Sequence, residues 1–216
     1  MADSSVAPAP RTRAAFLCSR IGSGVAIAPL GVWTVIHLWD NLAAFFGAEA
    51  WESSVTGHAN PASLALTSVV VLAPLVLHTV WGIGRLFTAR PNNRRVPTFG
   101  NLKYLLQRLS AVGVLFFLGA HLWLAFIEPR FLEGRPEPFV DIAHEMRHHG
   151  PTLVVYLLGT LGVAYHLANG VFTFAMGWGL CASRPALRRI ERFSILFFVV
   201  LLAMSWAAIY ALWRAG

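Results

Sequence analysis

Four histidines stand alone in four separate apolar stretches of this 216-residue chain: His37, His78, His121 and His166. An ionisable side chain in hydrocarbon is costly and needs a partner, so one histidine in each of four stretches favours shared ligands. Two neutral imidazoles from separate helices can fill both axial positions of a haem iron. The pattern therefore predicts two bis-histidine haems, which have no open position for oxygen or substrate and so pass only electrons.

Other uses of these histidines are weaker alternatives. Zinc would need three or four ligands at one depth, but each predicted pair has no cysteine or carboxylate beside it. Because no Cys-x-x-Cys-His motif occurs, the haems would be non-covalent and of b type. The remaining alternative is that the histidines only form hydrogen bonds between packed helices.

A second histidine motif, His144-Glu-x-x-His148, matches the zinc-protease pattern in which two histidines bind metal and the glutamate acts as base. It lies in a loop of mixed charge, and the apolar stretches after it contain no acidic residue that could serve as a further ligand. We interpret it as a short amphipathic loop helix with solvated histidines. His58, in another loop, has the same interpretation.

The composition indicates an integral membrane protein. Hydrophobic residues make up 56% of the chain and charged residues only 12%, with a mean hydropathy of +0.61, whereas a soluble domain usually carries about 25% charged residues. Five nearly uncharged runs each approach or exceed the roughly 20 residues that a helix needs to cross a bilayer. They are Ile21 to Trp39, Leu64 to Ile83, Leu109 to Ile127, Leu153 to Leu180 and Phe193 to Trp213.

The fold class follows from the cost of unpaired backbone groups in lipid. These runs lack the alternation of barrel strands, so helices are the expected spanning elements and the fold is all-α, with five transmembrane helices. Residues 1–19 are predicted to be a disordered, polar tail, and residues 20–216 a single membrane domain. No cleavage site follows a short apolar region, so we expect no removable signal peptide.

The net charge of +7 does not indicate nucleic-acid binding, because the cations gather at alternate helix ends. The cation-rich connections predict a cytoplasmic N-terminus, and the acidic connections predict an external C-terminus. Cys18 and Cys181 both map to the cytoplasmic side, where thiols stay reduced. The cations on that side are Arg11, Arg13, Arg20, Arg85, Arg90, Arg94, Arg95, Lys103, Arg108, Arg184, Arg188, Arg189 and Arg192.

The topology allows the histidines to be ranked by depth, using the helical rise of 1.5 Å per residue. His37 and His121 lie about 5 and 10 Å from the external surface, and form the outer pair. His166 and His78 lie about 22 and 25 Å deep, and form the inner pair. The two layers are about 12 to 15 Å apart in depth, which stacks the haems into an electron path across the membrane.

Local repeats support the same pairing. The first and third helices both read His-Leu-Trp, and the second and fourth both read His-x-x-x-Gly. Gly82 and Gly170 share a helix face with their histidines, where a missing side chain lets a flat macrocycle approach. Trp39 and Trp123 are suited equally to the interfacial aromatic belt and to contact with a haem.

These residues lie in fragments that together resemble one known family over nearly the whole chain from Arg20. The chain is similar to the single-subunit, two-haem cytochrome b membrane anchors, type B, of succinate:menaquinone oxidoreductases and quinol:fumarate reductases in the complex II family. The matching fragments are Pro29 to His37, Leu72 to His78, Phe87 to Ala89, Leu106 to Arg108, His121 to Trp123, His166 to Gly170, and Trp178 with Gly179.

The resemblance implies that the first four helices surround both haems. His37 and His121 would ligate the distal haem iron, and His78 and His166 the proximal one. A flavoprotein subunit with FAD and an iron-sulfur subunit would dock on the cytoplasmic face of a bacterial inner membrane. Electrons would pass between succinate or fumarate and a quinone, expected to be menaquinone, while this chain itself holds no dicarboxylate site.

Further ligands are predicted from position. Arg85 and Arg108 are the cations nearest the inner haem and suit its propionates, although they equally suit a role in orienting the helices. Asp40, Glu49 and Glu52 lie near the outer haem, where quinone chemistry needs groups that exchange protons. Two other functions stay open: a two-haem anchor for a hydrogenase or formate dehydrogenase, and a structural anchor without haem.

Overall fold

The computed structural model describes residues 13–57, 60–88 and 98–216, and within them the chain is helical with no strand. Five helical spans of these residues are long and apolar enough to cross a membrane. The predicted all-α fold with five transmembrane helices is therefore confirmed. The spans are Leu17–Phe46, Pro61–Phe87, Phe99–Leu132, Gly150–Gly177 and Arg184–Ala215.

Several spans consist of more than one helical element. Between the first two spans lie α3 (Ala48–Trp51) and η3 (Glu52–Thr56), and between the third and fourth lies α7 (Phe139–His148). The first span contains α1 (Arg13–Val25), η1 (Ala26–Gly31), α2 (Val32–Asn41) and η2 (Leu42–Phe46). The others are α4 (Pro61–Thr67), η4 (Ser68–Leu72) and α5 (Ala73–Phe87); α6 (Phe99–Leu122) and η5 (Trp123–Leu132); α8 (Gly150–Gly177); and α9 (Arg184–Ala215).

Local sequence explains where several of these helices begin. The side chains of Asn60, Thr98 and Ser183 accept hydrogen bonds from backbone N–H groups three residues ahead, at 2.9, 3.3 and 3.3 Å. Such caps satisfy donors that the first helical turn leaves without partners. Proline follows two of these caps, at positions 61 and 185, where its missing N–H costs nothing.

The N-terminal boundary differs from the prediction. Helix α1 begins at Arg13, so residues 13–19 of the predicted tail are helical. The polar composition was misleading because Leu17 and the residues after it already belong to an apolar span. Residues 1–12 of that tail, with Arg11, lie outside the described residues, as do His58, Arg90, Arg94 and Arg95. The first span bends at Pro29, where proline interrupts the helical hydrogen bonds.

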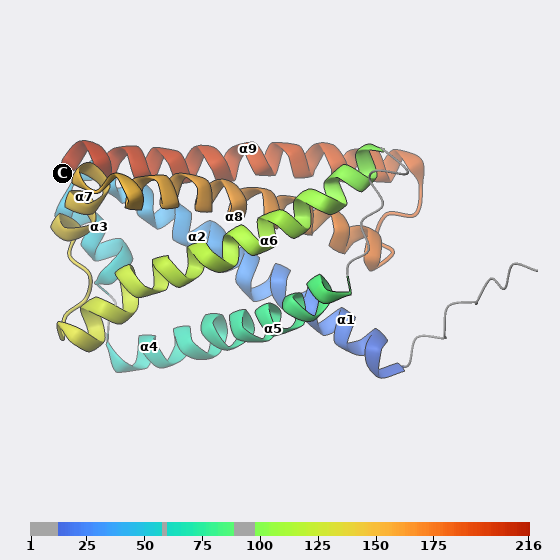
Figure 1. Cartoon of the computed structure of the whole chain (residues 1–216), viewed down its shortest axis with the longest axis horizontal. Helices are drawn as coiled ribbons and strands as arrows, with labels where there is room; N and C mark the ends of the chain where they lie inside the picture. The colour runs from blue at the N-terminus through green and yellow to red at the C-terminus, as the bar shows by residue number, and fades with distance from the viewer. Residues whose placement is uncertain (1–12, 58–59, 89–97) are drawn as a thin grey trace, which may run out of the picture.

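The spans form an elongated bundle with two different ends (Figure 1). Helix α8 packs along both α6 and α9, whereas α5 packs mainly on α1. One end, which we call the α7 end, holds α3, α7 and the C-terminus. The other, which we call the arginine-rich end, holds the start of α9 and the end of α5.

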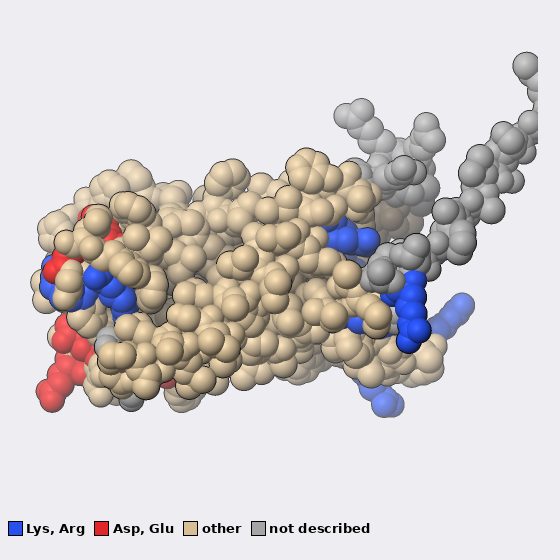
Figure 2. All heavy atoms as spheres, turned by 90° about the horizontal axis from the view of Figure 1, so that it is seen from below, with Lys and Arg blue, Asp and Glu red and all other residues tan. Residues whose placement is uncertain are grey.

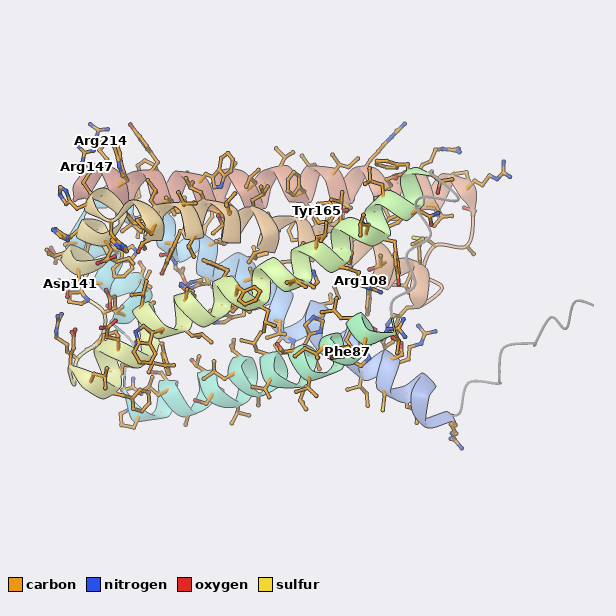
Figure 3. All side chains as sticks on the ribbon, viewed as in Figure 1. Phe87, Arg108, Asp141, Arg147, Tyr165 and Arg214 are labelled. Atoms are coloured by element: carbon orange, nitrogen blue, oxygen red, sulfur yellow. The ribbon has the colours of Figure 1, made fainter. Side chains whose placement is uncertain are left out.

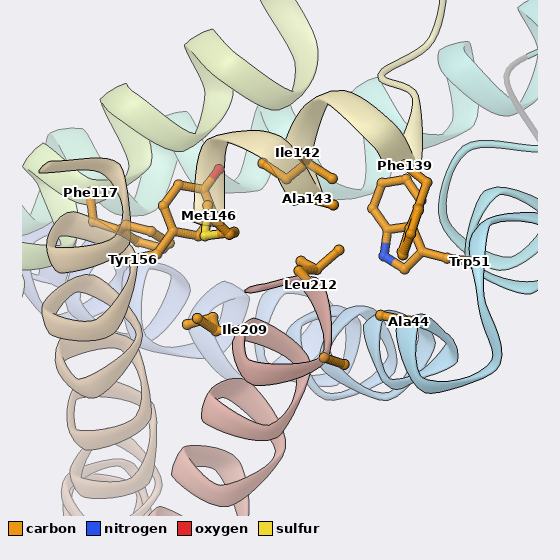
Figure 4. Close-up of a cluster of buried hydrophobic side chains, with 11 residues drawn as sticks. Ala44, Trp51, Phe117, Phe139, Ile142, Ala143, Met146, Tyr156, Ile209 and Leu212 are labelled. Carbon is orange, nitrogen blue, oxygen red and sulfur yellow. The ribbon is translucent and has the colours of Figure 1, made fainter. Parts of the chain in front are cut away.

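The main hydrophobic cluster lies at the α7 end (Figure 4). Met146 of α7 is fully buried, and it packs in one cluster with Tyr156 of α8 and Leu212 of α9. The apolar windows of the first three spans bury only 6–11% of their residues inside the protein, against 33% for the last two. The first three spans therefore present most of their apolar surface outward, as lipid-facing helices do.

Charges lie at both ends of the bundle and leave a broad uncharged middle (Figure 2). Acidic side chains gather at the α7 end, together with some cations, while the opposite end shows only cations on this face. The labelled Asp141, Arg147 and Arg214 all lie at the α7 end (Figure 3). This distribution matches a protein whose middle lies in hydrocarbon.

Candidate haem sites

The structure brings the four histidines together in the two pairs that the depth ranking grouped. The ring centres of His37 and His121 are 5.9 Å apart, with 62° between the ring planes. Those of His78 and His166 are 6.2 Å apart, with 66° between the planes. Each pair joins two different spans, so bundle packing and not local sequence creates it.

In the inner pair, hydrogen bonds fix which imidazole nitrogen is engaged. The Nδ1 atom of His78 lies 3.0 Å from the backbone oxygen of Gly22, which can only accept a hydrogen bond. Nδ1 therefore carries the proton, and Nε2 keeps a free lone pair. The Nδ1 atom of His166 lies 3.3 Å from Ser110 Oγ and 3.2 Å from Gln107 Nε2.

In the outer pair, Nδ1 of His121 lies 3.1 Å from the hydroxyl of Tyr156. The ring of His37 stacks on Trp33, with centres 4.6 Å apart and planes within 9°. Asn41 donates to the backbone oxygen of His37 at 2.8 Å, and its Nδ2 lies 3.4 Å from His37 Nε2. Asn41 is itself held by a hydrogen bond from Trp51 Nε1 at 3.2 Å.

Two glycines allow an aromatic ring to lie beside a histidine. A Cβ atom on Gly22 would collide with the ring of Trp81, which lies 5.7 Å from the His78 ring. A Cβ atom on Gly159 would collide with Phe117, whose ring stacks on His121 at 5.5 Å and 17°. The helices can approach this closely because glycine has no side chain.

The geometry of both pairs fits a haem iron. Imidazoles on opposite sides of one metal have ring centres about 6 Å apart, because each metal–nitrogen bond is about 2 Å long. The observed 5.9 and 6.2 Å agree with this spacing. A Cβ atom on Gly82 or Gly170 would meet nothing within 4 Å, so both positions could admit a flat group. Within the described residues, no cluster of three or more metal-ligating side chains forms.

The two predicted propionate partners have different surroundings. Arg108 has a buried Nε without a hydrogen-bond partner among the described residues, and its guanidinium lies 4.5 Å from the centre of the Tyr104 ring. Arg85 is exposed in the last turn of α5. A buried guanidinium nitrogen without a partner is costly, so Arg108 suits an anion inside the bundle.

Sequence reasoning missed a second arginine of this kind. Arg130, on the same span as Arg108, also has a buried Nε without a hydrogen-bond partner in the described part of the chain. Its guanidinium lies 4.8 Å from the centre of the Phe126 ring, again four residues earlier. The repeated aromatic-x-x-x-Arg spacing was the available signal.

The three predicted proton-exchanging carboxylates do not form one group. Only Glu52 lines the cavity of about 580 Å³ at the α7 end, where its Oε1 accepts a hydrogen bond from Phe139 N at 2.9 Å. Glu49 is exposed and Asp40 is partly buried, and neither lines this cavity. The fold therefore separates Glu52 from the other two.

A carboxylate that the sequence reasoning missed faces the same cavity. Glu137 lies between Pro136 and Pro138, and all three line it. Burial raises the pKa of Glu137 to about 7, and the nearby carboxylates of Asp141 and Glu133 add to that rise. A group with this pKa exchanges protons near neutral pH. The flanking prolines were the only local signal of an ordered loop.

The His-Glu-x-x-His segment forms helix α7, as predicted. His144 and His148 are exposed, while Phe139, Ile142 and Met146 on the other face are buried in the main cluster. Glu145 accepts a hydrogen bond from Thr152 Oγ1 at 3.0 Å and lies 3.3 Å from Nδ1 of His149. The segment is an amphipathic helix that covers the bundle end.

Exposure also distinguishes the two roles considered for the tryptophans. Trp39 is 68% exposed and Trp123 is 49% exposed. Exposed indoles on apolar spans fit the interfacial belt better than a site between helices.

The chain is similar over most of its length to one characterised bacterial protein. It is 29% identical over 198 residues to the succinate dehydrogenase cytochrome b558 subunit of Bacillus subtilis. The aligned region covers 91% of this chain and 96% of that protein. No family model matches the chain. This similarity and the five apolar spans agree with the sequence fragments that resemble cytochrome b membrane anchors. The chain is thus a multi-pass membrane protein, similar over most of its length to a cytochrome b subunit of succinate dehydrogenase.

Proposed function

We propose that this chain is the two-haem cytochrome b anchor of a succinate:quinone oxidoreductase in a bacterial inner membrane. Its histidine pairs, with ring centres 5.9 and 6.2 Å apart in two layers of one bundle, carry the proposal. His37 and His121 would ligate one haem iron, and His78 and His166 the other. Bound haem would supply reversible one-electron chemistry.

The polypeptide itself orients and surrounds these ligands. Hydrogen bonds at Nδ1 of His78, His121 and His166 leave Nε2 of each ring for the iron. Aromatic rings pack beside a histidine in each layer, Trp81 beside His78 and Phe117 beside His121, and would limit the access of water to the iron. Arg108 would pair with a propionate of the inner haem through its buried Nε.

The partners follow from the function of the relative. We infer that a flavoprotein with FAD and an iron-sulfur subunit dock at the arginine-rich end, which would be cytoplasmic by the excess of cations. The N-terminus would then be cytoplasmic and the C-terminus external. Electrons would move between the iron-sulfur subunit and a quinone, expected to be menaquinone.

Proton exchange with the quinone would take place at the α7 end. The cavity beside Glu52 and Glu137 supports this position, because it places a carboxylate with a pKa of about 7 at the α7 end. Asp40 and Glu49 belong to the same end of the bundle but lie outside the cavity. Glu52 is thus the predicted carboxylate with the best support.

Haem content is the direct test. We expect about two b haems per polypeptide in natively expressed, detergent-purified protein, with no spectral shift on addition of carbon monoxide. Protein without haem would contradict the proposal and return the histidines to helix packing. Copurification with flavoprotein and iron-sulfur subunits that oxidise succinate would identify the enzyme. Copurification with a hydrogenase or formate dehydrogenase would instead show that the chain anchors that enzyme.

A further inference from the structure

We propose that Ser110 and Tyr156 are positioning residues that tune the two haems separately. Each would accept a hydrogen bond from the Nδ1–H of one histidine, Ser110 from His166 and Tyr156 from His121. Each would thereby lower the midpoint potential of the haem in its own layer. The inference rests on the proposed function, since these hydrogen bonds affect a potential only when the histidines ligate iron.

Around His166, Ser110 offers the side-chain acceptor for Nδ1–H. The Ser110 hydroxyl donates to the backbone oxygen of Gln107 at 3.2 Å, so its own proton is already used. Its oxygen lies 3.3 Å from Nδ1 of His166 and keeps a lone pair for it.

The side-chain amide of Gln107 cannot take the same role in this arrangement. Its Nε2 donates to the backbone oxygen of His166 at 3.1 Å, and its Oε1 accepts from Asn169 Nδ2 at 2.7 Å. The amide is therefore held with its NH₂ group toward His166, and an amide nitrogen accepts no hydrogen bond. Gln107 and the buried Asn169 instead hold the backbone beside the ring.

Around His121, the acceptor is a phenol in a rigid setting. Tyr156 is 7% exposed, and its hydroxyl lies 3.1 Å from Nδ1 of His121. Its ring packs edge-on against Phe117, with centres 5.4 Å apart, and it lies close to Met146 in the main cluster (Figure 4). These contacts involve the ring carbons, so Tyr156→Phe removes the oxygen and keeps the packing.

The expected electronic effect has a definite sign. An acceptor at Nδ1–H makes the imidazole a stronger electron donor, which favours the more positive, oxidised iron and lowers the midpoint potential. Loss of the acceptor should therefore raise the potential. His78 bonds to a backbone oxygen that no side-chain substitution removes directly, so the inner layer keeps one acceptor when Ser110 is replaced.

The test is a redox titration of the complete enzyme complex, followed in the visible spectrum and resolved into two haem components. The variants His37→Ala and His78→Ala first assign each component to a layer. We expect Tyr156→Phe to raise only the outer midpoint potential and Ser110→Ala only the inner one. Ser110→Thr, which keeps a hydroxyl, should restore the inner value.

Matched controls remove hydroxyls that bond elsewhere. Tyr165 lies on the same helix as Tyr156, but its hydroxyl reaches the backbone oxygen of Lys103 at 3.5 Å. Ser205 of α9 bonds to the backbone oxygen of Leu201 at 2.7 Å. Tyr165→Phe and Ser205→Ala should leave both potentials unchanged.

The outcomes separate this inference from the proposed function. A wild-type complex without haem would refute the proposed function. Suppose that two haems are bound. The inference alone would be overturned if neither Tyr156→Phe nor Ser110→Ala changed a midpoint potential, or if one of these variants shifted both potentials by the same amount. Selective loss of one haem in the matching variant would support a positioning role. If Tyr156→Phe does not assemble, the potential in Ser110→Ala decides.

Discussion

The inner and outer histidine pairs have nearly the same geometry but are held by different means. The outer pair adjoins the main hydrophobic cluster, where Phe117 and Tyr156 both contact His121. The inner pair lies away from that cluster and is held by polar contacts: the Gly22 backbone oxygen at His78, Ser110 at the His166 ring, and Gln107 at the His166 backbone. Apolar packing and buried hydrogen bonds can thus impose the same spacing on two imidazoles.

Removal of one histidine from a pair should have the largest effect, which is loss of the haem from that layer only. His78→Ala or His166→Ala should remove the inner haem, and His37→Ala or His121→Ala the outer one, so each variant retains about one haem of the two. The physical reason is that one imidazole leaves the iron with an empty axial position. Pyridine haemochrome assays and difference spectra measure the loss. Depletion of one spectral component by both His37→Ala and His78→Ala would contradict the pairing.

The glycines beside each pair should show the next largest effect. Gly22→Ala should push the Trp81 ring away and shift the backbone oxygen of residue 22, which bonds to His78. Gly159→Ala should displace Phe117 beside His121. We expect each to cost about 1–3 kcal/mol of stability through overpacking, and to lower haem occupancy in its own layer.

Gly113→Ala provides the control, because a Cβ atom there meets nothing within 4 Å. It should raise helix stability slightly, since alanine is the better helix former. Thermal unfolding and haem content of the three variants, measured in the same detergent, give the comparison. Equal effects of all three would show that close approach at Gly22 and Gly159 has no role.

Arg108 offers a smaller effect confined to the inner layer. Arg108→Gln should weaken retention of the inner haem about 10- to 150-fold, because the propionate loses a charged partner with a buried nitrogen (about 1.5–3 kcal/mol for a hydrogen bond to a charged group). The exposed Arg85→Gln is the matched control and should retain haem. Release of haem to a soluble acceptor measures the difference. If Arg85→Gln had the larger effect, the assignment of these cations would be reversed.

The sequence carried more information about the histidines than about their supports. Four lone histidines in apolar runs predicted the layers, because depth follows directly from helical rise and interfacial charges. The acceptors were not predictable in this way. Ser110 meets His166 across two spans, and Tyr156 meets His121 across the same two, so both contacts depend on the rotation of packed helices.

The carboxylates in the loops were also not predictable from their positions in the sequence. Asp40, Glu49 and Glu52 were grouped because they are close in sequence, but only Glu52 faces the cavity. Glu137 is 85 positions away from Glu52 in the chain and shares the cavity with it. Tertiary placement of α7, which no periodicity in the spans encodes, brings the two carboxylates together.

The smallest predicted effect concerns Glu137 and pH. Its pKa is raised from 4.5 to about 7, mainly by burial, so the folded protein holds a proton that the unfolded chain releases between these values. Stability should therefore fall as pH rises from about 4.5 to 7 and then stay level. Glu137→Gln should remove this dependence and stabilise the protein above pH 7 by on the order of 1 kcal/mol, a value discounted because the side chain is only half-buried. Thermal unfolding at pH 5 and 8 measures the stabilisation by Glu137→Gln, with Glu49→Gln at an exposed position as the control. A stabilisation by Glu137→Gln that is equal at both pH values would show that Glu137 is ionised throughout.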